Sequence, residues 1–148
     1  MNYKEIINLK LDNIINNLEV LKSSGLNKKN VLLTKQHSDL LLEISKQEES
    51  NLNNLLTSIK DLYEFLSLIK KNSIKDIICD INDENLNTKY NTLLTLENEV
   101  KKINELNCEL VTQCSNINTY YLNLLYPQED NGYNMDNSLI NKKLKKYL

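Results

Sequence analysis

Apolar residues recur at alternating steps of three and four residues along most of this 148-residue chain. A period near 3.5 is typical of a helix that packs one narrow stripe, or seam, against other helices. The longest such stretch has a single polar seam position, Asn107, and its apolar positions are Leu93, Leu96, Val100, Ile103, Leu110, Cys114, Ile117, Tyr121 and Leu124. Neither Gly nor Pro interrupts it before Pro127. The pattern therefore predicts a helix from about residue 84 to 126, roughly 64 Å long.

A first helix is predicted from Tyr3 to about Gln36, with its seam at Ile7, Leu11, Ile14, Leu18 and Leu21. Gly25 follows two serines inside this helix. Because Gly costs about 1 kcal/mol relative to Ala in a helix interior, a kink or a break is expected there. The apolar pattern resumes at Val31, and residues 37–39 are expected to form the turn into the next helix.

A second helix is predicted from about Asp39 to Lys71, with its seam at Leu52, Leu55, Ile59, Leu62, Leu66 and Ile69. Residues 45–51 are polar on every side, so this part is expected to face solvent, with Glu48 and Glu49 as surface charges. Ser73, followed by Asp76, resembles a capping box for a short connector helix over residues 74–81. Asp83 and Glu84 then place a cap and an acidic charge at the start of the long third helix.

These elements predict an all-α fold: an elongated antiparallel helical hairpin or coiled-coil bundle of three long helices, with a short connector helix and a flexible C-terminal tail. Residues 1–126 are expected to form a single helical domain, and residues 127–148 the tail. Residues 93–103 are expected to pack on the first two helices. Residues 104–125 are the part of the third helix that we expect to be offered to a partner.

Charge and hydropathy restrict the classes of partner. The net charge is −2 with both signs interspersed, and every basic residue other than the lone histidine is lysine. Nucleic-acid binding normally needs a basic stripe, usually with arginine, so it is not expected. No apolar run is long enough to span a bilayer, and the basic C-terminal segment is too short for stable membrane insertion. Charges in the amino-terminal segment argue against a signal peptide, so a cytoplasmic location is expected.

The residues offer little for catalysis. His37 is the only histidine, and no second ligand lies at helical spacing from it, so no metal site is expected. The chain has no Gly-rich phosphate loop, and its thiols have no neighbouring histidine to activate them. We therefore expect neither an enzyme nor a bound cofactor.

The third helix carries a more specific motif. Residues 103–111 read INELNCELV, of the form L-N-x-x-N-x-x-L-[LIV], which puts Asn104 and Asn107 on one helix face. The motif is followed by YYLNLLYP at residues 120–127 and by a Gly132-Tyr133 turn. This stretch resembles the FlgN family of flagellar type III export chaperones. The resemblance is closest over residues 103–133 and extends more loosely to residues 31–54.

The resemblance implies a cytoplasmic chaperone that binds the carboxy-terminal helix of hook-associated proteins, which join the hook to the filament. Such a chaperone keeps its client unpolymerised and delivers it to the export gate and its ATPase complex. An amphipathic helix whose seam outruns its partners would receive the client helix in a helix-in-groove mode. In the family a tail tyrosine contacts the export gate, and the matching position here is Tyr133. The candidate client-binding residues are Asn104, Asn107, Leu110, Val111, Ile117, Tyr121, Leu122 and Leu125.

Two alternatives stay open at this level. The candidate client-binding residues could pack only against the first two helices, and Tyr133 could be a solvated tail residue. The whole chain could also be a structural coiled-coil or scaffold subunit that self-associates through its seam. A scaffold would be stable as an oligomer, whereas a chaperone is expected to be a monomer or weak dimer that gains stability from its client.

Overall fold

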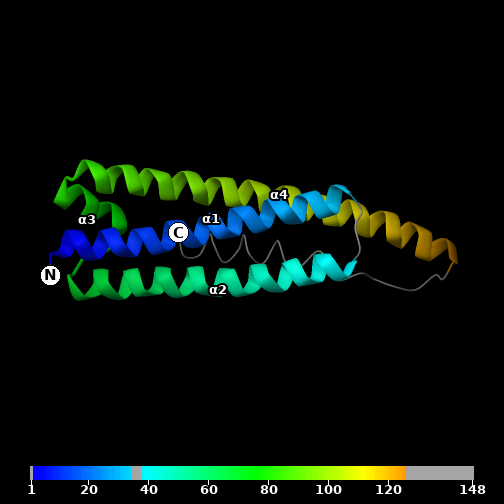
Figure 1. Ribbon diagram of the computed structural model, residues 1–148, viewed down its shortest axis with the longest axis horizontal. Coiled ribbons are helices and arrows are strands. Elements are labelled where there is room, and N and C mark those ends of the chain that lie inside the picture. The colour runs from blue at the N-terminus through cyan, green and yellow to red at the C-terminus, as the bar shows by residue number, and fades with distance from the viewer. Residues whose placement is uncertain (1, 35–37, 126–148) are drawn as a thin grey trace.

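The computed structural model describes residues 2–34 and 38–125, with residues 38 and 114–125 described as backbone alone. They form four helices: α1 (Tyr3–Leu33), α2 (Ser38–Leu68), α3 (Ile74–Ile81) and α4 (Glu84–Leu125). The described ranges contain no strand. The all-α class, the three long helices and the short connector agree with the prediction, and the helices form an elongated bundle (Figure 1).

Helix α1 is the shared partner of the other two long helices, since α2 and α4 both pack along it. α2 runs back antiparallel to α1, and α4 then runs parallel to α1 (Figure 1). α3 turns the chain between α2 and α4 at the end of the bundle where α1 begins. Ion pairs between Lys10 and Asp61, and between Lys22 and Glu99, join α1 to α2 and to α4 respectively.

The seam residues predicted from the 3.5-residue period form the core. The large side chains that are least exposed are Ile7, Leu11, Ile14, Leu18, Leu52, Leu55, Ile59, Leu62, Leu66, Ile78, Leu86 and Leu93. α3 contributes Ile74, Ile77 and Ile78, which cap the core at its closed end. A buried apolar side chain of this size stabilises a fold by about 1.5–3 kcal/mol relative to exposure, so this seam is the main source of stability.

Local hydrogen bonds explain where the connector begins and ends. The Ser73 hydroxyl accepts from the backbone N–H of Asp76 at 3.1 Å, as the capping pattern predicts. Asn82 adopts a left-handed conformation (φ 50°) and its N–H donates to the Ile78 carbonyl, which ends α3. Asp83 then caps α4, because its Oδ1 accepts from the N–H of Leu86 at 3.1 Å.

Two helix ends differ from the prediction. α1 ends at Leu33 and not near residue 36. Thr34 closes the helix by donating its N–H to the Asn30 carbonyl. α2 ends at Leu68 and not at Lys71, because Lys70 takes a left-handed conformation (φ 56°). The N–H of Lys71 then donates to the Leu66 carbonyl at 2.9 Å, the six-residue closure of a Schellman motif. The sequence does not indicate this end, because a left-handed position is usually occupied by Gly or Asn and here it is occupied by Lys70.

Gly25 does not break the helix, since α1 runs as one helix through that residue. Gly25 is buried, and the space that a side chain at this position would fill is taken by Ile103 of α4. The glycine therefore serves the contact between two helices and does not interrupt α1.

No helix within the described residues combines the length and the apolar character needed to cross a membrane.

Candidate functional site

The contact between Gly25 and α4 sets the register of the two parallel helices. A Cβ built on Gly25 would lie 2.8 Å from Cγ2 of Ile103, closer than carbon atoms can approach. The missing side chain thus lets the two backbones come together. The Asn107 side chain uses this proximity, because its Nδ2 donates to the Gly25 carbonyl at 2.8 Å.

From this register α1 stops well before α4 does. α1 ends at Leu33, eight residues after Gly25 (33 − 25), and eight residues after Ile103, the α4 residue that lies against Gly25, is Val111 (103 + 8). α4 continues to Leu125, about 14 residues further, or roughly 21 Å at 1.5 Å per residue. Figure 1 shows this yellow-to-orange end of α4 extending past the ends of both α1 and α2. We call residues 112–125 the overhang.

The candidate client-binding residues divide between the bundle and the overhang. Asn104 (3% exposed), Asn107 (0%) and Val111 (5%) lie inside the bundle, and Leu110 is half-buried. The packed zone of α4 therefore extends to Val111 and does not stop at Ile103 as predicted.

The other four candidates, Ile117, Tyr121, Leu122 and Leu125, lie on the helical backbone of the overhang, in the part described without side chains. Tyr133 lies outside the described residues.

Both asparagines of the motif keep one amide atom without a hydrogen-bond partner among the described residues. These atoms are Nδ2 of Asn104 and Oδ1 of Asn107. Asn104 also approaches α1, because its Oδ1 lies 3.9 Å from the Cβ position built on Gly25. A buried polar atom without a partner costs about 1–3 kcal/mol, so the motif fixes the position of α4 at some expense of stability.

A buried ion pair lies near this contact. Nζ of Lys28 on α1 is 3.0 Å from Oε2 of Glu48 on α2, and the two side chains are 3% and 2% exposed. The prediction that residues 45–51 face solvent on every side is wrong at Glu48. The spacing of the seam indicates that both residues face the core. Lys28 continues the three-and-four spacing after Leu21 and Gly25, and Glu48 lies four residues before Leu52. The two charged residues therefore continue the seams of α1 and α2.

Together these residues form what we call the polar layer: Gly25, Lys28, Glu48, Asn104 and Asn107. On one side of it is the main core, which extends along α1, α2 and α4 as far as Leu21, Leu52 and Val100. On the other side, towards the overhang, is a smaller group of buried apolar residues that we call the distal cluster: Val31, Leu32, Ile44 and Val111.

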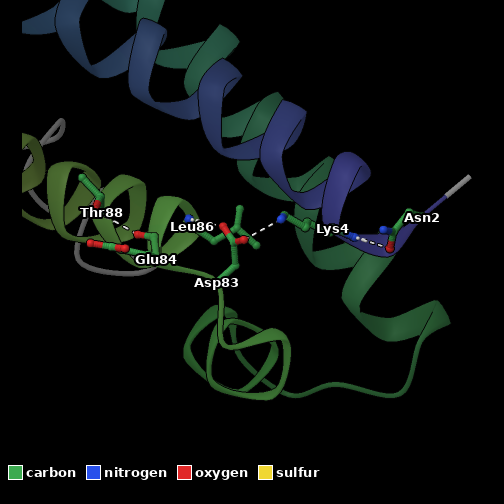
Figure 2. Close-up of polar contacts among 6 residues, drawn as sticks. All are labelled: Asn2, Lys4, Asp83, Glu84, Leu86 and Thr88. Atoms are coloured by element: carbon green, nitrogen blue, oxygen red, sulfur yellow. Dashed lines mark hydrogen bonds and ion pairs between the residues drawn. The ribbon is translucent and has the colours of Figure 1, made fainter.

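At the opposite end of the bundle an ion pair joins α1 to the start of α4. Figure 2 shows the starts of α1 and α4 beside one another, joined by Lys4 and Asp83. Nζ of Lys4 lies 2.5 Å from Oδ2 of Asp83. The hydrogen bond from Lys4, followed by the N–H of Leu86, lowers the pKa of the Asp83 carboxyl below its ordinary value. Asn2 caps α1 by accepting from the N–H of Lys4.

Among the described residues, no group of three or more His, Cys, Asp or Glu side chains is placed to hold a metal ion. Comparison with family models, with curated proteins and with solved structures found no match to this chain. The resemblance of residues 103–133 therefore rests on its motifs, and the function has to be argued from those motifs together with the architecture.

Proposed function

We propose that this chain is an export chaperone of the FlgN type, which binds the carboxy-terminal helix of a hook-associated protein and delivers it to the flagellar type III export gate. The observation that carries the proposal is the overhang. α4 continues about four turns past the end of α1, on which it packs, and past the neighbouring end of α2, and four of the candidate client-binding residues lie on that extension.

The length of the overhang suits this role. An isolated helix shorter than about 12–15 residues is marginal in water, so a helix end that extends about 14 residues past the other described helices gains stability when another helix packs along it. A client segment that is disordered before binding folds on the same surface and contributes its own apolar seam. Two such segments in register give the knob-into-hole contact that the 3.5-residue pattern of α4 favours.

The alternative occupant of the overhang is a second copy of the chain, as in a structural coiled-coil subunit. The two functions differ in oligomeric state. A scaffold is expected to have the mass of a dimer or higher oligomer in the absence of any client. A chaperone is expected to stay largely monomeric until its client is added.

The test is co-purification with a hook-associated protein supplied full-length and without its carboxy-terminal helix. We expect the full-length client to be retained and the truncated client to be lost. Equal retention of both forms contradicts the proposed binding mode. Light scattering of the free chain completes the comparison, because a stable oligomer with no client binding favours the scaffold.

A further inference from the structure

Among the side chains that the structure describes, the two ends of the bundle differ widely in the number of buried apolar residues. The main core contains 17 buried apolar side chains drawn from α1, α2, α3 and α4. The distal cluster has Val31, Leu32, Ile44 and Val111, and none of the four belongs to the main core. Local opening in proteins follows this kind of difference, because segments with few buried apolar contacts separate at a lower free energy than the rest.

The polar layer lies between these two parts and favours a break at that level. Opening the distal end brings water to Nδ2 of Asn104 and Oδ1 of Asn107, the two amide atoms that lack a partner while buried. Lys28 and Glu48 likewise regain hydration, which offsets part of the attraction lost when they separate. The main core also has a buried amide oxygen without a partner, Oδ1 of Asn8, but opening it would expose the larger set of buried apolar side chains to water.

This difference also resolves a conflict in the placement of the candidate residues. Asn104, Asn107 and Val111 are at most 5% exposed in the closed bundle, so a client helix cannot reach them there. A surface that begins at the overhang and continues into the bundle becomes available only when the distal end separates.

We propose that the distal end of the bundle opens as a unit at the polar layer while the main core stays closed, and that a client helix binds the opened faces of α4 next to the overhang. The occupant is an amphipathic helix with an apolar seam, and its identity rests on the proposed function. The free chain is therefore a gated form, in which the fraction open reduces the apparent affinity for the client by that same fraction.

Hydrogen exchange of the free chain, followed by mass spectrometry, tests the opening directly. We expect amides at 26–33 and 104–113 to exchange about 100-fold faster or more than amides at 7–18 and 86–100. The exchange of the first group should also change little at low denaturant concentration, as for a local opening. Equal protection in both groups overturns the inference, even if the client binds.

A matched pair of substitutions in α2 tests whether opening limits binding. Ile44→Val removes one methylene from the distal cluster, and Ile59→Val removes the same group from the main core. Ile44→Val should raise distal exchange about fivefold and lower the apparent Kd of the client-helix peptide by the same factor. Ile59→Val should change neither. An unchanged or higher apparent Kd for Ile44→Val overturns the gating. Failure of the peptide to bind any variant, with fast distal exchange intact, overturns the proposed function and the occupant but leaves the opening established.

Discussion

Asn107 on α4 and Gly25 on α1 are 82 residues apart in the chain, and Nδ2 of the asparagine donates to the carbonyl oxygen of the glycine at 2.8 Å. The bond is possible because a residue without a side chain lets α4 approach α1 at this level. It fixes how far α4 slides along α1, and thereby how much of α4 is left as the overhang. The two residues thus connect the packing of the bundle to its proposed binding surface.

Gly25→Ala tests this close approach. The new Cβ would lie 2.8 Å from Cγ2 of Ile103, a methyl on a β-branched side chain that rotates poorly in a helix. Overpacking of this kind costs about 1–3 kcal/mol, which outweighs the gain of about 1 kcal/mol in helix propensity. Chemical denaturation should therefore show net destabilisation.

The control for Gly25→Ala is the same substitution combined with Ile103→Ala, which removes the colliding methyl. In that background the Ala should stabilise the chain relative to Gly, since only the propensity term remains. Ser23→Ala, on the exposed side of the same turn, should be close to neutral. Stabilisation by Gly25→Ala in the otherwise unchanged chain contradicts the account of this contact.

The buried ion pair gives a second prediction. Replacing Lys28 alone by Met removes the ammonium that lies 3.0 Å from Oε2 of the 2% exposed Glu48, and breaking a buried ion pair in this way costs about 3–5 kcal/mol. The double substitution Lys28→Met with Glu48→Leu removes both charges and should be close to neutral or stabilising. Thermal and urea unfolding of the single and double variants measure the difference.

The exposed pair Lys60 and Glu64 on α2 serves as the matched control, because its atoms are 3.9 Å apart and its side chains are 76% and 67% exposed. Loss of that pair should cost at most about 0.5 kcal/mol. A Lys28→Met variant as stable as the unmodified chain would show that the buried pair does not join α1 to α2 energetically.

The ion pair at the starts of α1 and α4 makes stability depend on pH. The pKa of Asp83 is lowered in the folded chain, so its contribution is present above its unfolded pKa of about 3.9 and is lost as the pH falls through the lower folded value. Asp83→Asn retains a cap acceptor but loses the charge, so its Tm should be below that of the unmodified chain at neutral pH. The two Tm values should converge in acid.

Lys4→Gln provides the control for this prediction, because it removes the cation that lowers the pKa of Asp83. In that background Asp83→Asn should have a smaller effect on Tm at neutral pH. A Tm difference between Asp and Asn that stays constant from pH 7 to acid would contradict the assignment.

The periodic apolar pattern is sufficient to predict the helices, their seams and the caps at Ser73 and Asp83, because these depend on residues close together in the sequence. The role of Gly25 could not be predicted in the same way. Its neighbour Ile103 lies 78 residues further along the chain (103 − 25). The local sequence alone predicts only that a glycine inside a helix weakens that helix.

The candidate site was only partly predictable for a related reason. Periodicity shows that Asn107 faces the seam, but it does not show whether the seam at that level meets α1 or a client. The answer depends on where α1 ends, and Thr34 closes that helix earlier than its apolar pattern suggests. The burial of Lys28 and Glu48 could not be predicted locally, because each charge pairs with a residue on a different helix.

A substitution at Tyr133 tests delivery to the export gate separately from client binding. Under the proposed function this tyrosine contacts the export gate, so Tyr133→Ala should leave client co-purification unchanged and lower secretion of the client. Tyr147→Ala, at another tail tyrosine, is the matched control and should secrete normally. Normal secretion by the Tyr133→Ala strain counts against the docking assignment.

The client-helix interaction itself is tested by comparing two leucines of α4. Leu110 is half-buried beside the overhang, and Leu94 is 40% exposed within the packed part of the bundle. An aspartate at a position covered by the client leaves an unpaired charge in an apolar contact, which costs several kcal/mol. Leu110→Asp should therefore weaken binding about 100-fold or more, and Leu94→Asp should not change it. Unfolding of the free Leu110→Asp chain, seen by circular dichroism, would assign Leu110 to the internal core.

The most direct measurement is a calorimetric titration of the free chain with a peptide of the carboxy-terminal helix of the co-purifying hook-associated protein. We expect saturable one-to-one binding that is retained by Leu94→Asp and lost in folded Leu110→Asp. No binding by the unmodified chain, or equal binding by both folded variants, would contradict it.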